Sequence, residues 1–94
     1  MNIDITARNF HISDNLKDLI QQKINKLLIY NSSIFLIEVI LLKESRAEKI
    51  ELIVHSKQQK YFTKCYSSLF EKTLAKAIQN IIKQIKKTKI KYQL

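Results

Sequence analysis

Residues 2–28 read NIDITARNFHISDNLKDLIQQKINKLL, and the spacing of their apolar side chains changes partway along. Ile3, Ile5 and Ala7 alternate with polar residues, which is the pattern of a half-buried strand. Ser13 or Asp14 can then cap a helix, because a short side-chain oxygen accepts from its first free N–H groups. The next apolar residues recur at helical spacing. They are Leu16, Leu19, Ile20, Ile24, Leu27 and Leu28. The chain therefore opens with a strand followed by an amphipathic helix.

Three more strands are predicted downstream of a turn at residues 31–33. The first covers 34–43, and its outward Glu38 places four apolar residues toward the core: Phe35, Ile37, Val39 and Leu41. The second covers about 48–56, with Ile50, Leu52 and Val54 inward. The third covers 60–66. Its pattern leaves open which of its two faces is buried, that of Tyr61, Thr63 and Cys65 or that of Phe62, Lys64 and Tyr66.

A second helix closes the chain. The segment Ser68-Leu69-Phe70-Glu71 fits a capping box at its start. Its apolar stripe contains Phe70, Leu74, Ala77, Ile78, Ile81 and Ile85. The element order β-α-β-β-β-α predicts a two-layer α+β fold, a four-stranded mixed sheet with both helices packed on one face. A groove between the helices would be lined by Lys23, Lys26 and lysines of the second helix.

The composition fits one small domain spanning residues 1–94. Because the chain has no Gly and no Pro, its turns must rely on Asn and Ser. The lone Cys65 cannot form an internal disulfide, and no apolar run reaches the roughly 20 residues that span a bilayer. Met1 leads directly into the first strand, which leaves no room for a signal peptide. We therefore expect a cytoplasmic protein.

The positive charge is concentrated in the C-terminal part of the chain. The formal net charge is +9, and residues 60–94 carry nine lysines against Glu71 alone. At about 100° per residue, Lys72, Lys76, Lys83 and Lys87 share the helix face opposite the apolar stripe. A one-sided positive field attracts nucleic acid or an anionic surface. The alternative is that these lysines only keep the helix soluble.

Other residue types give no sign of catalysis or of a bound metal. His11, His55 and Cys65 do not have the spacing of a metal site, and the acidic residues form no pair suited to acid–base work. No enzyme activity, cofactor, metal or small-molecule substrate is therefore expected. The aromatic residues at 61, 62 and 66 either pack against neighbouring strands or stack on bases.

The opening MNIDITARNFHISDNLKDLIQQKINKL resembles that of the ribosome hibernation promoting factor family, also called ribosome-associated inhibitor A or sigma-54 modulation proteins. That family opens with I-x-I-T-G-R-x-F-x-I-T-D-x-L-K, and the closing KQIKKTKIK resembles its basic R-Q-L-x-K-x-K-x-K run. The chain departs from the pattern at Ala7, where the family has Gly, and at LFEKTLA, which replaces D-M-Y-A-A-I-D.

This resemblance implies a short form without the C-terminal dimerisation domain of long members. It implies binding to the small ribosomal subunit, to 16S ribosomal RNA and ribosomal proteins of the mRNA and tRNA channel, at the A and P sites. Translation would be inhibited and idle ribosomes preserved during stress or stationary phase in bacteria. We expect the free protein to be monomeric.

The family motif carries an RNA-binding role to seven residues of this chain: Arg8, Lys23, Lys26, Lys83, Lys86, Lys87 and Lys89. Helical geometry and proximity add Lys72, Lys76 and Lys91. Arg8 could equally pair with Asp14 or Asp18. The competing hypotheses are a generic module for structured or double-stranded RNA and a protein that lies on membranes through its second helix.

Overall fold

A computed structural model describes the backbone of residues 1–93 and the side chains of residues 1–88. Its elements are β1 (Asn2–Arg8), α1 (Asp14–Asn25), the 3₁₀ helix η1 (Lys26–Ile29), β2 (Ile34–Lys43), β3 (Glu48–Ser56), β4 (Lys60–Ser67) and α2 (Phe70–Gln93). This order confirms the predicted β-α-β-β-β-α sequence. The first helical stripe, however, is shared between α1 and η1.

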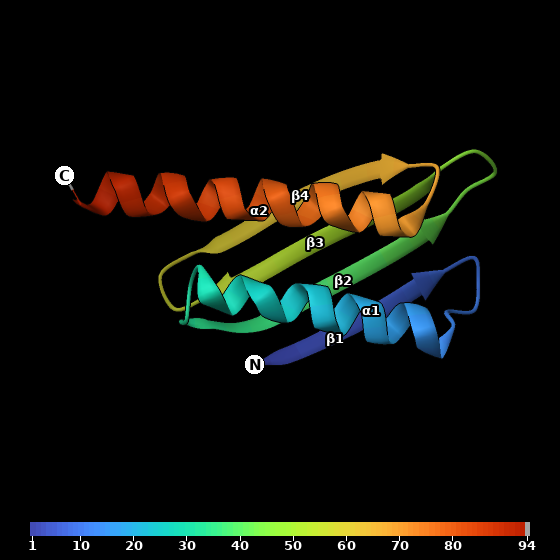
Figure 1. The fold of residues 1–94 in the computed structure, drawn as a ribbon, viewed down its shortest axis with the longest axis horizontal. Helices are drawn as coiled ribbons and strands as arrows, with labels where there is room; N and C mark the ends of the chain where they lie inside the picture. Colours follow the sequence, from blue (N-terminus) through green and yellow to red (C-terminus); the bar gives the residue numbers. More distant parts are fainter. Residues whose placement is uncertain (94) are drawn as a thin grey trace.

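The four strands form one mixed sheet in the order β1-β2-β3-β4. β1 pairs with β2 in parallel, and the other two pairings are antiparallel. A parallel pair requires a crossover, which α1 supplies. Figure 1 shows α1 and α2 side by side in front of the same face of this sheet. The predicted two-layer fold is therefore confirmed, and the sheet keeps one face without a helix.

The core lies between the helices and the covered sheet face. The strands contribute alternate residues to it: Ile37, Val39, Leu41, Ile50, Leu52 and Val54, all fully buried. Ile20, Ile24 and Leu27 enter from α1 and η1, and α2 adds Phe70, Leu74, Ala77, Ile81, Ile82 and Ile85. Among residues 1–93, no helix is long and apolar enough to cross a bilayer.

Phe35 was predicted to face the core, and this prediction was wrong. Ile34 pairs with Ser56 and Leu36 pairs with His55, so Phe35 is an extra residue in β2 without a partner on β3. Such a bulge shifts the alternation of side chains by one position. Ile34 is consequently buried, whereas 53% of Phe35 is exposed.

The face of β4 that the sequence left open is settled by its contacts with α2. Tyr61, Thr63 and Cys65 are buried beneath the helix, while Phe62 and Tyr66 are exposed on the other side. The buried Thr63 hydroxyl accepts a hydrogen bond from Nδ2 of Asn80 on α2, with the two atoms 3.1 Å apart. Polar atoms of this covered face are thereby satisfied.

In this chain without glycine, asparagine and serine occupy the turn after β1 and the cap of α1. Asn9, after β1, has a φ of 70°, a left-handed conformation that asparagine tolerates better than most residues. The Oγ atom of Ser13 accepts from the Leu16 N–H at 3.1 Å and caps α1. Of the two candidate caps, serine is therefore the one used.

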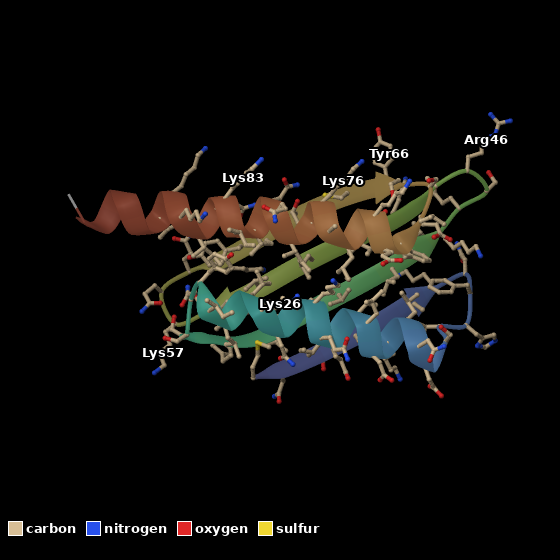
Figure 2. All side chains as sticks on the ribbon, viewed as in Figure 1. Lys26, Arg46, Lys57, Tyr66, Lys76 and Lys83 are labelled. Carbon is tan, nitrogen blue, oxygen red and sulfur yellow. The ribbon has the colours of Figure 1, made fainter. Side chains whose placement is uncertain are left out.

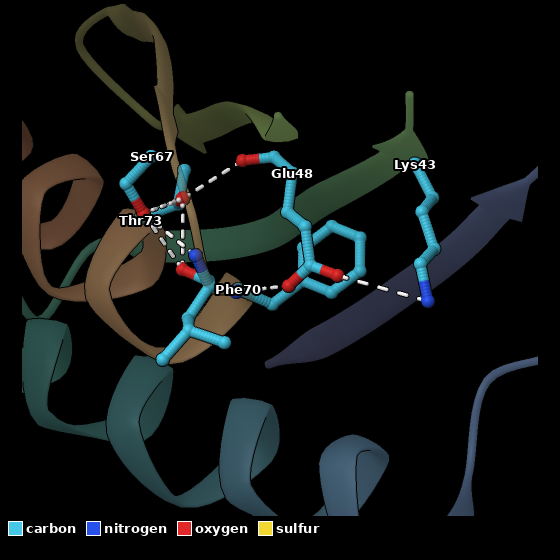
Figure 3. A network of polar contacts seen from close by, with 6 residues as sticks. Lys43, Glu48, Ser67, Phe70 and Thr73 are labelled. Atoms are coloured by element: carbon cyan, nitrogen blue, oxygen red, sulfur yellow. Dashed lines mark hydrogen bonds and ion pairs between the residues drawn. The ribbon is translucent and has the colours of Figure 1, made fainter. Parts of the chain in front are cut away.

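The N-terminus of α2 is capped across space by Glu48, at the start of β3 (Figure 3). The Phe70 N–H donates to Oε1 of Glu48 at 2.7 Å, and the Thr73 hydroxyl contacts the Glu48 carbonyl oxygen at 2.8 Å. The capping box predicted from Ser68 and Glu71 was wrong, because the helix begins at Phe70 and uses a carboxylate 22 residues away. A carboxylate there also complements the helix dipole.

Replacing this cap is expected to destabilise the domain. Glu48→Ala leaves the Phe70 N–H without its acceptor and should cost about 1–2 kcal/mol of unfolding free energy. Glu48→Gln, which keeps an acceptor oxygen but no charge, should cost less. Urea denaturation measures both. Glu44→Ala, which removes an exposed acid from the same hairpin, is the control, and an equal loss in both alanine variants would contradict the capping role.

Candidate nucleic-acid interface

A row of lysines runs along the outer side of α2. Lys72, Lys76, Lys83 and Lys87, here called the α2 ridge, are all exposed. From Lys72 to Lys87 the row extends about 22 Å, at a helical rise of ~1.5 Å per residue. Figure 2 shows Lys76 and Lys83 pointing the same way, on the side of α2 away from α1. The predicted common face of these four lysines is thus present.

The ridge is held in place by the opposite side of the same helix. Ala77 and Ile81 are completely buried against the sheet, and Ile85 nearly so. On the β4 side, Nε2 of Gln84 donates to the Phe62 carbonyl oxygen at 2.9 Å. These contacts fix both the position of α2 and its rotation about its own axis. The lysines of the ridge are therefore held on one side of the helix.

A hollow of about 140 Å³ lies between the two helices. Leu19 and Lys23 line it from α1, and α2 contributes Glu71, Leu74, Ala75 and Ile78. Lys23 therefore lies where the topology predicted it, but the α2 ridge points away from this groove. Lys26 is exposed at the start of η1 (Figure 2).

Lys86 is positioned differently from the ridge. Its Nζ atom lies 5.8 Å from the centroid of the Tyr30 ring, a cation–π contact between α2 and the end of η1. The contact links the later turns of α2 to the first helical segment. No pattern in the sequence relates these two residues, because it arises from the packing of elements far apart along the chain.

Among the side chains of residues 1–88, no ion pair involves a lysine of α1, η1 or α2. Among the described side chains, ion pairs join Lys43 to Glu48, Lys49 to Glu44, His55 to Glu38 and Lys64 to Glu51. All of these lie in the sheet or its β2–β3 hairpin. Within residues 1–88, the helical lysines therefore remain available to an external polyanion without breaking an internal pair.

Arg8 does not join the helical lysines. Ile5 and Ala7 of β1 face the helices, so alternation turns Arg8 to the open face of the sheet. There it lines a hollow of about 150 Å³ with residues of β2, β3 and β4. Its alternative pairing with Asp14 or Asp18 is absent among the described ion pairs. The predicted site residues thus lie on two faces.

Two predicted site residues, Lys89 and Lys91, have side chains outside the described set. The backbone of α2 continues past both of them to Gln93.

In residues 1–93, no group of His, Cys, Asp and Glu is arranged to hold a metal ion. What the helical face offers chemically is a rigid surface of point charges, which suits the recognition of phosphates by position and shape.

Comparison with known proteins gives one family and several similar folds. Residues 3–93 match the family model described as sigma 54 modulation protein / S30EA ribosomal protein. A ribosomal subunit interface protein from Coxiella burnetii has a TM-score of 0.89 at 20% identity, covering 96% of this chain and 99% of that one. The N-terminal domain of Protein Y from Thermus thermophilus gives 0.86 at 20% identity, covering 94% and 99%. No curated protein sequence matches the chain.

Proposed function

The chain belongs to the sigma 54 modulation protein / S30EA ribosomal protein family, and from that premise we propose that it is a ribosome hibernation factor. In this proposal it binds the small ribosomal subunit in the channel for mRNA and the A- and P-site tRNAs. Occupying that channel blocks translation and preserves inactive ribosomes under stress or in stationary phase. The protein acts in the cytoplasm as one ribosome-binding domain, and it makes or breaks no covalent bond.

Family membership supports a function on the ribosome, and the helical face supports the mode of binding. The single observation that carries the proposal is the α2 ridge, a rigid row of lysines with no internal ion pairs among the described side chains. Structured ribosomal RNA is recognised mainly through its phosphates and its shape. Each lysine that meets a phosphate also releases condensed counterions, which favours binding.

The proposed ribosomal contacts are the lysines of the helical face: Lys23, Lys26, Lys72, Lys76, Lys83, Lys86 and Lys87. Lys89 and Lys91 extend the proposal beyond the described side chains. Lys86 is expected to contribute less than the ridge, because it is already engaged with Tyr30. Arg8 lies on the other face and is not part of this contact surface.

Sucrose-gradient fractionation tests the proposal directly. The protein should migrate with small subunits and whole ribosomes at low salt, and it should inhibit translation in a cell-free system. An unrelated RNA duplex should compete poorly at matched salt. Equal competition by the duplex would favour a generic module for double-stranded RNA, and a protein found only at the top of the gradient would refute ribosome binding.

The affinity for small subunits should fall steeply with salt. If about six lysines contact phosphates, a plot of log association constant against log salt concentration should have a slope on the order of −4 to −5. Titrations of labelled protein with small subunits at 50–200 mM salt, a range of about four-fold, measure the slope. A slope near zero would show that phosphate contacts do not drive binding.

A further inference from the structure

The face of the sheet turned away from the helices carries a second, different pattern. Along β4 its outward residues are Lys60, Phe62, Lys64 and Tyr66, so cationic and aromatic side chains alternate. Phe62 is 50% exposed and Tyr66 is 68% exposed. The two residues lie four positions apart on one strand, which separates their Cα atoms by about 13 Å. Figure 1 shows both helices on the opposite face of the sheet.

The two rings have different neighbours on the adjoining strand, one basic and one apolar. Lys49 of β3 lies directly opposite Tyr66, and Phe62 lies opposite Ile53. Ala47, Lys49, Lys64 and Tyr66 line an open hollow of about 380 Å³. The adjoining hollow shares Lys49 and Lys64 and adds Arg8 from β1. We call six residues of this face the β4 platform: Lys60, Phe62, Lys64 and Tyr66 of β4, Lys49 of β3 and Arg8 of β1.

The acidic residues of the open face do not prevent a polyanion from binding to this platform. Glu51 and Glu44 pair with Lys64 and Lys49 at 3.8 and 3.2 Å, but partly exposed pairs of this kind contribute little free energy. Asp4 and Glu38 lie on β1 and β2, and Glu38 is engaged with His55. The described outward residues of β4 include no acid, so a polyanion is directed along this strand.

We propose that the β4 platform is a second nucleic-acid surface that binds single-stranded RNA. Unpaired bases stack on Phe62 and Tyr66, while Lys60, Lys64 and Lys49 contact the phosphates between them. Single strands are the fitting ligand because only unpaired bases offer free ring faces to aromatic side chains, and such stacking requires no particular sequence. The alternation of lysines with the rings favours a nucleic acid over an apolar protein partner.

This inference goes beyond the proposed function. The α2 ridge recognises phosphates of folded RNA, whereas the platform recognises flexible strands, and the sheet separates the two surfaces. One molecule can therefore hold a structured RNA on its helical side and a single strand on its open side. Binding to the platform does not depend on the ribosome, so free oligonucleotides test it.

The test is fluorescence anisotropy of labelled 12-nucleotide poly(U) and poly(A) RNA with the full chain at low salt. The double variant Phe62→Ala with Tyr66→Ala should lower the affinity at least about ten-fold, since each base–ring stack contributes several-fold or more. Because both residues are at least half exposed, the variant should stay folded, which circular dichroism verifies. Its salt slope should be unchanged, since no charge is removed.

Leu69→Ala is the matched control, because Leu69 is 53% exposed and lies outside the platform. It should bind as the unchanged protein does. Tyr66→Trp supplies a direct reading of stacking, since the chain contains no other tryptophan. Its fluorescence should be quenched by single-stranded RNA, and much less by a duplex of the same length.

Three results would overturn the inference. They are equal oligonucleotide affinity of the double variant and the unchanged protein, tryptophan quenching that is equal with a duplex, and sedimentation showing that the double variant abolishes a dimer instead. Ribosome binding is measured in parallel. If ribosome binding fails while oligonucleotide binding and its loss in the double variant persist, the proposed function fails and this inference stands.

Discussion

Reversing two charges of the α2 ridge, in Lys83→Glu with Lys87→Glu, is expected to weaken binding to the small ribosomal subunit about 100-fold at ~0.1 M salt. At a salt slope of roughly −0.8 per phosphate contact, one contact contributes about six-fold at this concentration. Losing two contacts therefore lowers affinity by about 40-fold, and the repulsion of two carboxylates from phosphates lowers it further. Both residues are exposed, so the fold should be kept.

A matched control separates the effect of the ridge lysines on affinity from the effect of the net charge. Arg46→Glu with Lys57→Glu changes the net charge by the same amount, at two exposed turns away from the ridge (Figure 2). It should weaken binding by only a few-fold, through the long-range field. Quantitative pelleting of small subunits measures both variants. Equal losses would mean that overall charge is what matters, and full affinity of the ridge variant would refute the chosen face.

The sequence was sufficient for the fold because local periodicity and element order agree. Ile3 and Ile5 mark an alternating strand, and the stripe containing Ile20 and Ile24 marks a helix. A helix between two strands favours a parallel crossover. In the structure, burial alternates along β1 and recurs at helical spacing along α1, as the sequence predicts. The α2 ridge was predictable for the same reason, since a helix fixes angular positions from sequence spacing alone.

What the sequence did not predict depends on contacts between distant segments. The bulge at Phe35 changes which residues of β2 face the core, and it is set by pairing with Ser56 and His55. Glu48 replaces the expected local cap of α2, because the hairpin brings its carboxylate to the Phe70 N–H. Local pattern cannot select between a nearby cap and a distant one when both are chemically suitable.

Arg8 shows what a family motif leaves open, which is the face of the sheet on which a residue lies. Its place in the family motif grouped it with the helical lysines, yet the alternation of Ile5 and Ala7 already assigned it to the opposite face. The structure places it beside Lys49 and Lys64 instead. A shared motif can therefore select a basic residue without giving the face of the sheet on which it lies.

Ile81→Ala should destabilise the domain more than any of the surface or capping substitutions does. Ile81 is completely buried between α2 and the sheet. Truncating a fully buried Ile leaves a cavity and typically costs about 2–5 kcal/mol. For a domain of this size, about 3 kcal/mol lowers the melting temperature by roughly 12–24 °C. Because small domains have about 5–15 kcal/mol of stability, the variant should remain mostly folded at 25 °C.

The same variant tests whether Ile81 only anchors the ridge or also contacts RNA. If Ile81 only holds α2 on the sheet, ribosome affinity at 25 °C should change less than about three-fold, since no charge is removed. Differential scanning calorimetry and subunit pelleting measure the two effects, with Ile29→Ala, at a side chain that is 80% exposed, as the control. That control should shift stability by no more than about 0.5 kcal/mol. An unchanged melting temperature in Ile81→Ala would contradict the packing of α2 that positions the ridge.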